Sequence, residues 1–216
     1  PVSGTTLITV KKAIHTDHGT NTGWQSSYGD GVAIITDGLS FTTAYWLIDG
    51  QTGGGPGSWP TGLGIKVDTG PIGPGVAATG GSGNLTFRHI EIQGNGGDGD
   101  GQWPNNELFN LAGSNILISH TYLHDAGRTI FFGQGSNVVI EYTYGGPHES
   151  TANEHSEIAS IWGGSPTRNW VVRYSVWTHI EGTGGFIMEG DGLEVYSNVF
   201  YQPGLESFGN GAVGTW

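Results

Sequence analysis

Apolar and polar residues alternate in five similar segments of the chain. The second and fourth positions of each segment are apolar, which is the period of two expected of a β-strand with one buried face. The inward positions should therefore be Leu85, Phe87, Ile116, Ile118, Val138, Ile140, Val172, Leu193 and Val195, with Thr86 and Glu194 facing outward. The segments are NLTFRHIEI (84–92), NILISHTYL (115–123), NVVIEYTYG (137–145), NWVVRYSVW (169–177) and GLEVYSNVF (192–200).

The starts of these segments are 31, 22, 32 and 23 residues apart, which indicates a repeat of about 22 residues with loops inserted in some copies. A second predicted strand precedes four of the copies, at 107–111, 129–132, 157–162 and 184–188. Units of short strands and tight turns stack as a solenoid, and the handedness of parallel crossovers favours a right-handed coil. The residues that open four copies should then form a side-chain ladder: Asn84, Asn115, Asn137 and Asn169.

The first 83 residues repeat less regularly. Strands are predicted at 6–14, 32–36 and 45–50, and loops at 15–31 and in the Gly/Pro-rich segments 51–83 and 93–106. No linker divides the chain. The prediction is one all-β domain over residues 1–216, a right-handed parallel β-helix with irregular opening coils (1–83) and regular coils (84–216).

The strand–Asn-turn–strand unit resembles the right-handed parallel β-helix proteins of the pectate-lyase-like superfamily. The opening SGTTLITVKKA is similar to the first coil of their secreted bacterial members. The resemblance covers most of the chain. It implies a secreted or cell-surface protein that binds polysaccharide and cleaves it as a lyase or glycoside hydrolase, with Ca²⁺ as the cofactor common in the lyases. Members are usually longer, so it also implies a fragment of a longer solenoid.

Composition narrows the function classes further. The chain has 216 residues, 41 of them Gly, no Cys and a formal net charge of -12. So acidic a chain is not expected to bind nucleic acid or an anionic membrane surface. No apolar run approaches the roughly 18 residues of a membrane span. The absence of Cys excludes a disulfide scaffold and a thiolate metal site.

Polar residues that follow the repeat strands should stack along one edge of the solenoid and approach one another there. Carboxylates and imidazoles at such distances shift each other's pKa and act as acid and base. A lyase also needs a cation, whereas a hydrolase needs two carboxylates. Catalytic candidates are Arg128 as the cation, His124, His148, Glu149, Glu154, His155 and Glu157; substrate-binding candidates are His179, Glu181 and Trp103. The spacing matches no metal motif, although Ca²⁺ would suit the carboxylates.

The same residues also fit a structural role, because solenoid edges carry acids and His that bond to their neighbours. Arg173 and Glu141, at one repeat position in adjacent coils, are expected to form such an ion pair. The alternative to an enzyme is therefore a non-catalytic structural or adhesive solenoid that self-associates laterally or end to end through its strand edges.

Two contacts and one covered stripe are expected. His124 should approach His148 or Glu149, and Glu157 should lie near Arg128. Leu117, Val139 and Val171 form an outward apolar column, which a loop or a neighbouring chain should cover.

Overall fold

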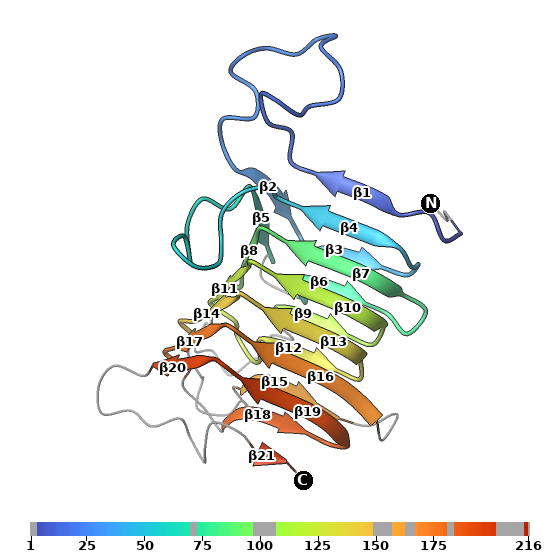
Figure 1. Cartoon of the computed structure of the whole chain (residues 1–216), viewed down its shortest axis with the longest axis vertical. Coiled ribbons are helices and arrows are strands. Elements are labelled where there is room, and N and C mark those ends of the chain that lie inside the picture. The colour runs from blue at the N-terminus through green and yellow to red at the C-terminus, as the bar shows by residue number, and fades with distance from the viewer. Residues whose placement is uncertain are drawn as a thin grey trace.

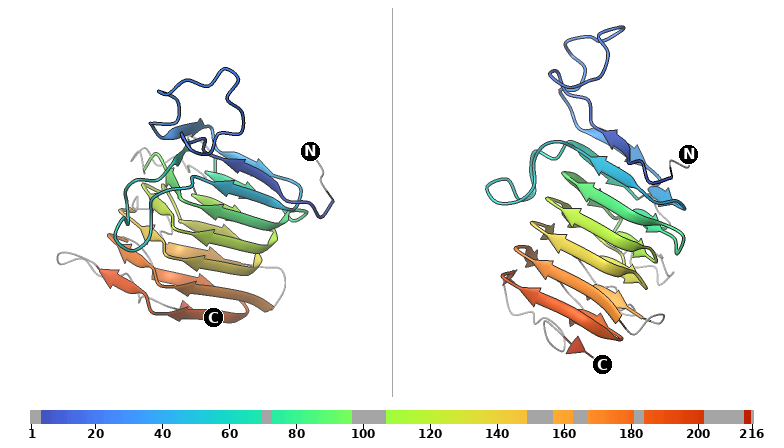
Figure 2. Two further views of the ribbon diagram at one scale, coloured as in Figure 1. Left: turned by 45° about the horizontal axis from the view of Figure 1, so that its top comes forward. Right: turned by 45° about the vertical axis from the view of Figure 1, so that its right-hand side comes forward.

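Three parallel β-sheets of seven strands each wind around a hydrophobic core in the computed structural model (Figure 1). It describes residues 4–69, 73–96, 107–148, 157–162, 167–180, 184–201 and 214–215. Each coil adds one strand to sheet one, one to sheet two and one to sheet three, in that order, and Figure 2 shows the coils stacked. The prediction of an all-β parallel β-helix is confirmed. Among the described residues, no helix is long and apolar enough to cross a membrane.

Sheet one carries the alternating segments of the sequence. Its inward residues pair coil on coil in the predicted register, for example Ile116 with Val138. All of the predicted inward residues belong to the core or pack against it, with Leu193 and Val195 partly buried at the last coil. The strands are β1 (Ile8–Lys11), β4 (Trp46–Asp49), β7 (Gly83–Arg88), β10 (Ser114–Ser119), β13 (Ser136–Glu141), β16 (Thr167–Arg173) and β19 (Asp191–Tyr196).

Sheets two and three complete each coil. Sheet two comprises β2 (Ala33–Thr36), β5 (Ile65–Asp68), β8 (Ile90–Gln93), β11 (Tyr122–His124), β14 (Tyr144–Gly145), β17 (Val176–Thr178) and β20 (Val199–Tyr201). Sheet three comprises β3 (Leu39–Phe41), β6 (Val76–Ala78), β9 (Phe109–Leu111), β12 (Phe131–Gly133), β15 (Glu157–Ile161), β18 (Gly184–Met188) and β21 (Gly214–Thr215).

The loop predicted over 51–83 is wrong in part. This segment contains β5 and β6, and β3 also went unpredicted, so the opening residues build full coils that contribute to all three sheets. The alternation is present in β5, where Ile65 and Val67 are buried and Lys66 and Asp68 are not. Strands this short are hidden in the sequence by the Gly and Pro residues that flank them.

Single left-handed residues make the sharp turns of each coil. The Asn ladder is confirmed: Asn137 Nδ2 donates to Asn115 Oδ1 at 3.0 Å, and Asn169 Nδ2 to Asn137 Oδ1 at 2.9 Å. Asn tolerates the positive φ found here, 51–56° along the ladder, better than most residues. A second left-handed column bends the chain from sheet one to sheet two, at His89, His120, Tyr142, Tyr174 and Ser197.

Loop insertions concentrate at the two edges of sheet two. The chain between sheets one and two is long in the first two coils (12–32 and 50–64), and the chain after sheet two is long at 94–108 and 146–156. By contrast, the turn from sheet three to sheet one is short in every coil from β6 onward. Because loops border sheet two on both sides, its outward face is the first place to search for a functional site.

Candidate functional site

Five polar side chains form a closed ring of contacts on the outward face of sheet two. Lys66 Nζ lies 3.0 Å from Glu91 Oε1, and the same oxygen lies 3.2 Å from His124 Nε2. His124 Nδ1 is 2.8 Å from Asp125 Oδ2, to which Gln93 Nε2 donates at 3.1 Å. Lys66 Nζ closes the ring by donating to Gln93 Oε1. These residues, called the polar ring below, come from three successive coils.

The register of sheet two explains this assembly. Lys66 of β5 pairs with Glu91 of β8, and Gln93 of β8 pairs with His124 of β11. Alternate residues of a strand share a face and neighbouring coils lie about 4.8 Å apart, so long polar side chains at these positions meet. Asp125 follows β11 in a left-handed conformation and carries its carboxylate back toward the ring.

Tyr122 adds a phenol to the polar ring. Its aromatic ring stacks on that of His124, with centroids 4.1 Å apart and planes 14° from parallel. Burial, and then the charges of Asp125 and Glu91, raise the pKa of Tyr122 to about 12. The phenol therefore keeps its proton at neutral pH and is available as a proton donor.

The loop over residues 50–64, between β4 and β5, lies along one side of this face. His89 Nδ1 donates to the carbonyl oxygen of Gly53 at 2.7 Å, and a side chain at Gly54 would overlap the backbone of His120. The loop, cyan in Figure 1, therefore rests on the bend just before β8 and β11 begin. It borders the strands that carry Tyr122 and His124.

Arg128 is engaged in a structural pair. Its Nη1 donates to Glu107 Oε1 at 3.1 Å, and its guanidinium lies 4.8 Å from the centroid of the Phe132 ring. The backbone bond from Ile130 N to Glu157 O, 3.2 Å, places Glu157 in the next coil. Its predicted approach to Arg128 stays a prediction. Glu107 and Glu157 are both buried, so this cluster offers a substrate little more than the edge of Arg128.

His148 lies inside the solenoid rather than on its edge. It is fully buried, and its Nδ1 donates to the carbonyl oxygen of Ala126 at 2.8 Å. The expected contact with His124 is replaced by separate partners, because both ring nitrogens of His124 face Glu91 and Asp125. His124 takes an outward position of β11, whereas His148 follows the Gly146–Pro147 turn into the interior.

Burial lowers the pKa of His148 to about 4, well below its usual 6.5, despite backbone hydrogen bonds to Ala126 and Arg128. The unfolded chain therefore binds the proton more tightly. The contribution of neutral His148 to the free energy of unfolding is complete above about pH 6.5. It falls by about 3 kcal/mol as the pH drops toward 4. Urea unfolding across this range should show that loss, and His148→Gln should reduce it. An equal loss in His148→Gln would contradict the assignment.

The remaining predicted site residues fall into two groups. His179 is exposed and left-handed, with its Nδ1 2.8 Å from Thr178 Oγ1, two coils beyond His124. The others lie outside the described residues: Trp103, Glu149, Glu154, His155 and Glu181. No group of three or more His, Asp or Glu within the described part of the chain is placed to hold a metal ion.

The sequence did not single out Lys66, Glu91, Gln93 or Tyr122, whereas Asp125 stood out as the polar residue beside His124 after a repeat strand. The available signal was alternation: Leu123 points inward, so Tyr122 and His124 must point outward together. The contribution of Lys66 was hidden because β5 itself went unpredicted.

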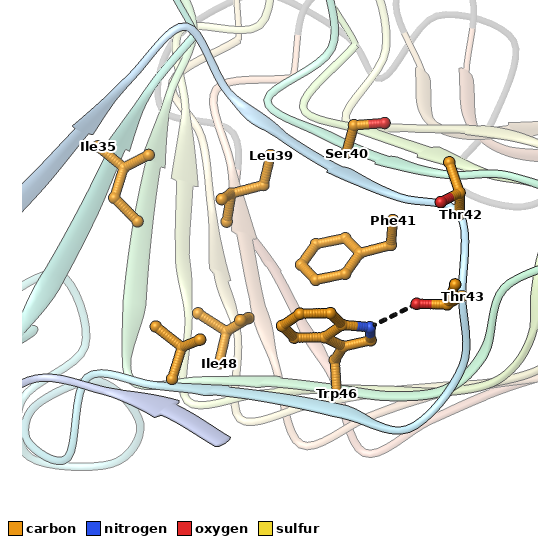
Figure 3. A pocket seen from close by; sticks show the side chains of 9 residues that line it. Ile35, Leu39, Ser40, Phe41, Thr42, Thr43, Trp46 and Ile48 are labelled. Carbon is orange, nitrogen blue, oxygen red and sulfur yellow. Dashed lines mark hydrogen bonds between the residues drawn. The ribbon is translucent and has the colours of Figure 1, made fainter. Parts of the chain in front are cut away.

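Two hollows away from the polar ring carry less chemistry. The groove along sheet one, about 660 Å³, has Leu117 and Val139 in its lining. Both are partly buried, as is Val171, and the expected ion pair is present at its margin, with Arg173 Nη2 2.6 Å from Glu141 Oε2. The hollow at the first coil is lined by apolar residues such as Phe41 and Trp46, with hydroxyls but no titratable side chain (Figure 3).

No family model matches the chain, and no curated protein matches its sequence. A solved structure does resemble it: the crystal structure of an alginate lyase from Paenibacillus sp. str. FPU-7. The TM-score is 0.50 at 11% sequence identity, and the match covers 87% of this chain and 80% of the lyase chain. At this identity the likeness shows a shared fold. It does not by itself assign the chain to the pectate-lyase-like superfamily.

Proposed function

We propose that this protein is a polysaccharide lyase that acts on uronic acid residues at the polar ring. The observation that carries the proposal is the stack of Tyr122 on His124 beside the ammonium group of Lys66. A fold shared with an alginate lyase supports it, as does the loop that walls this face. A secreted or cell-surface location belongs to the same proposal, since that is where such polymers are met.

Lyases cleave by β-elimination, and the polar ring offers a group for each step. Asp125 holds the Nδ1–H of His124. Once the substrate displaces Glu91, which takes the proton shared with Nε2, this nitrogen is the base that removes the proton from C5 of the uronate. The electron pair forms the C4–C5 double bond, the C4–O bond breaks, and the leaving oxygen takes the proton of Tyr122. Lys66 offsets the negative charge that builds on the carboxylate. The tyrosinate then regains a proton from His124 or water.

Substrate must open the ring before this chemistry begins. Glu91 Oε1 occupies both Lys66 Nζ and His124 Nε2, so the sugar carboxylate and C5–H have to take its place. The net charge of -12 opposes the binding of a polyanionic polysaccharide. Added salt should therefore raise the affinity for this substrate by screening the repulsion. Ca²⁺, which the family resemblance implies, would offset the same repulsion as a counter-ion.

Glycoside hydrolysis is the second candidate function. Glu91 and Asp125 present carboxylates to the two nitrogens of one imidazole, which holds them apart on the same face. Two carboxylates about 5–9.5 Å apart are the requirement for hydrolysis. The products separate the candidates, because only a lyase leaves an unsaturated sugar. The non-catalytic solenoid predicts no product at all and self-association instead.

The test is a panel of alginate, polygalacturonate and neutral polysaccharides, with product detected as ultraviolet absorbance and as mass. The lyase proposal predicts unsaturated oligouronates, and a loss of at least about a hundredfold in turnover for Lys66→Met. Lys11→Met is the matched control, because Lys11 pairs with Asp17 away from the ring. Saturated products would support the hydrolase, and products unaffected by Lys66→Met would place the chemistry elsewhere.

A further inference from the structure

We propose that the polymer bound at the polar ring is a copolymer, in which the reacting uronate is flanked by uncharged sugars that lie on a tyrosine-rich part of sheet two. This inference rests on the proposed function and narrows its substrate class. It follows from where the aromatic side chains of the outward face gather and from where the few cations of the chain lie.

One column of paired residues crosses the outward face of sheet two and changes character at β11. Lys66 pairs with Glu91, and Glu91 pairs with Tyr122, so the column passes through the polar ring. It continues along the solenoid, one residue per coil, through β14, β17 and β20 (Figure 1), at Tyr144, Val176 and Val199. At about 4.8 Å per coil, the part from Tyr122 to Val199 is about 14 Å long, which is room for roughly three sugar units.

Tyrosines gather along this part of the column. Six of the eight tyrosines in the chain lie on sheet two or at the bend that leads into it, and all but Tyr122 are called the tyrosine surface below: Tyr142, Tyr144, Tyr174, Tyr196 and Tyr201. Tyr144 packs edge-on to Tyr122, with centroids 5.6 Å apart, and Tyr142 stacks on Tyr174 at 5.4 Å. Tyr174 and Tyr201 are 40% and 58% exposed. The tyrosine surface is therefore continuous with the polar ring and open to a ligand.

The chemistry of the tyrosine surface suits uncharged sugars. Its strands and the bends before them, 142–145, 174–178 and 197–201, contain no Lys, Arg, Asp or Glu. A phenol combines an apolar ring with a hydroxyl that donates and accepts, which matches the apolar C–H face and the hydroxyls of a sugar. Tyr also loses little conformational entropy on binding. Sugars can therefore bind here without a charge on either partner.

The cations of the chain lie elsewhere. All seven Lys and Arg residues belong to the described part of the chain, and Lys66 is the one in the polar ring. The other six bond to carboxylates or backbone carbonyls away from it: Lys11, Lys12, Arg88, Arg128, Arg168 and Arg173. The site can thus pair one uronate carboxylate at a time.

Arg173 does not change this balance, although it touches the tyrosine surface. Its Nη1 donates to the hydroxyl of Tyr196 at 3.1 Å, and its guanidinium lies 5.5 Å from the centroid of the Tyr174 ring. Glu141 Oε2, 2.6 Å from Nη2, neutralises it. Arg173 therefore holds the tyrosines in place and adds no net charge.

A homopolyuronate would bring a carboxylate to every sugar position on this face. Carboxylates over the tyrosine surface would meet no cation, in a chain whose net charge is -12. Like charges brought together at an interface oppose binding and so select against the wrong partner. A polymer that separates its uronates by uncharged sugars escapes this repulsion and still offers one carboxylate to Lys66.

Two matched pairs of polymers test the inference on the full chain. Rhamnogalacturonan, in which galacturonate alternates with neutral rhamnose, is compared with polygalacturonate, and gellan, whose glucuronates are separated by neutral sugars, with polyglucuronate. In the pair whose uronate the site accepts, kcat/KM should be at least about tenfold higher for the copolymer at equal ionic strength. Equal values, or a preference for the homopolymer, would overturn the inference.

Val176→Lys tests the tyrosine surface itself by adding a cation to it. Val176 is a partly buried outward residue of β17, two coils beyond Tyr122. The new ammonium group should raise kcat/KM on the homopolymer by about two- to fivefold, the usual worth of an exposed ion pair, and should not raise it on the copolymer. Val199→Lys, at a position 56% exposed, is the second variant should Val176→Lys fold poorly.

Val171→Lys is the matched control. Val171 lies in the same coil and is also partly buried, but it faces outward from sheet one, and the substitution changes the net charge equally. It should leave the preference between the polymers as it is. A gain on the homopolymer that is equal in Val171→Lys, or absent from both sheet-two variants, would overturn the role of the tyrosine surface.

Binding separates this inference from the proposed function. Calorimetric titration of His124→Asn with oligosaccharides of the four polymers requires no cleavage. Tighter binding of a copolymer, with no unsaturated product from the parent chain, would support the sugar specificity and contradict the lyase. Unsaturated product formed as readily from the homopolymer would contradict the specificity alone. Failure to bind any of the four would overturn both.

Discussion

Replacing His124 by Asn should lower polysaccharide turnover by about a hundredfold to ten-thousandfold, which is the usual worth of a positioned acid or base. The melting temperature should change by only a few degrees. His124 touches Glu91 and Asp125, which are 22% and 36% exposed, so water solvates both carboxylates once the imidazole is gone. The steady-state rate of unsaturated product and a thermal melt measure the two effects.

Tyr122→Phe tests the second proton-transfer group with the stacked ring retained. It should lose turnover on a similar scale, while Tyr142→Phe, which removes a hydroxyl from the stack on the neighbouring bend, should not. If Tyr122→Phe and His124→Asn both keep full turnover, the polar ring is a structural network.

A methyl group at Gly145 should destabilise the fold by about 3 kcal/mol or more. Gly145 of β14 lies opposite Trp177 of β17, and a Cβ there would overlap the Cε3 and Cζ3 atoms of the indole. Trp177 is completely buried and packs edge-on to Phe131 and Phe186, so it has no open direction in which to move. Gly145 has no positive φ, and the cost of Gly145→Ala is therefore steric.

Urea unfolding of a double-mutant cycle measures this coupling. Trp177→Leu alone should destabilise by leaving a cavity, and Gly145→Ala should cost much less in that background than in the parent chain. Equal costs in the two backgrounds would show that the indole is not what excludes a side chain at Gly145.

The regular coils were predictable because their pattern is local. Ile116 and Ile118 alternate with Leu117 over a strand and recur in the next coil at Val138 and Ile140, so the inward face follows from the sequence alone. The Asn ladder was predictable for the same reason, since one residue type recurs at one turn. In β5, by contrast, four residues between glycine-rich loops left too short a pattern to recognise.

The site was harder to predict because it is assembled across coils. Lys66, Glu91 and His124 meet only through the register of three strands, and loops of unequal length separate them in the sequence. His148 shows the opposite error: the sequence placed it after a predicted strand, as it placed His124, but the chain turns His148 inward, where burial keeps it neutral. Position after a strand therefore does not fix the direction of a side chain.

The central claim is that substrate binds on the outward face of sheet two. The most direct measurement is chemical-shift mapping of His124→Asn, in which cleavage is slow, with a short oligouronate. The account predicts shifts at Lys66, Glu91 and Tyr122, and none along the sheet-one groove at Leu117 and Val139. Shifts confined to that groove, with sheet two unaffected, would contradict it.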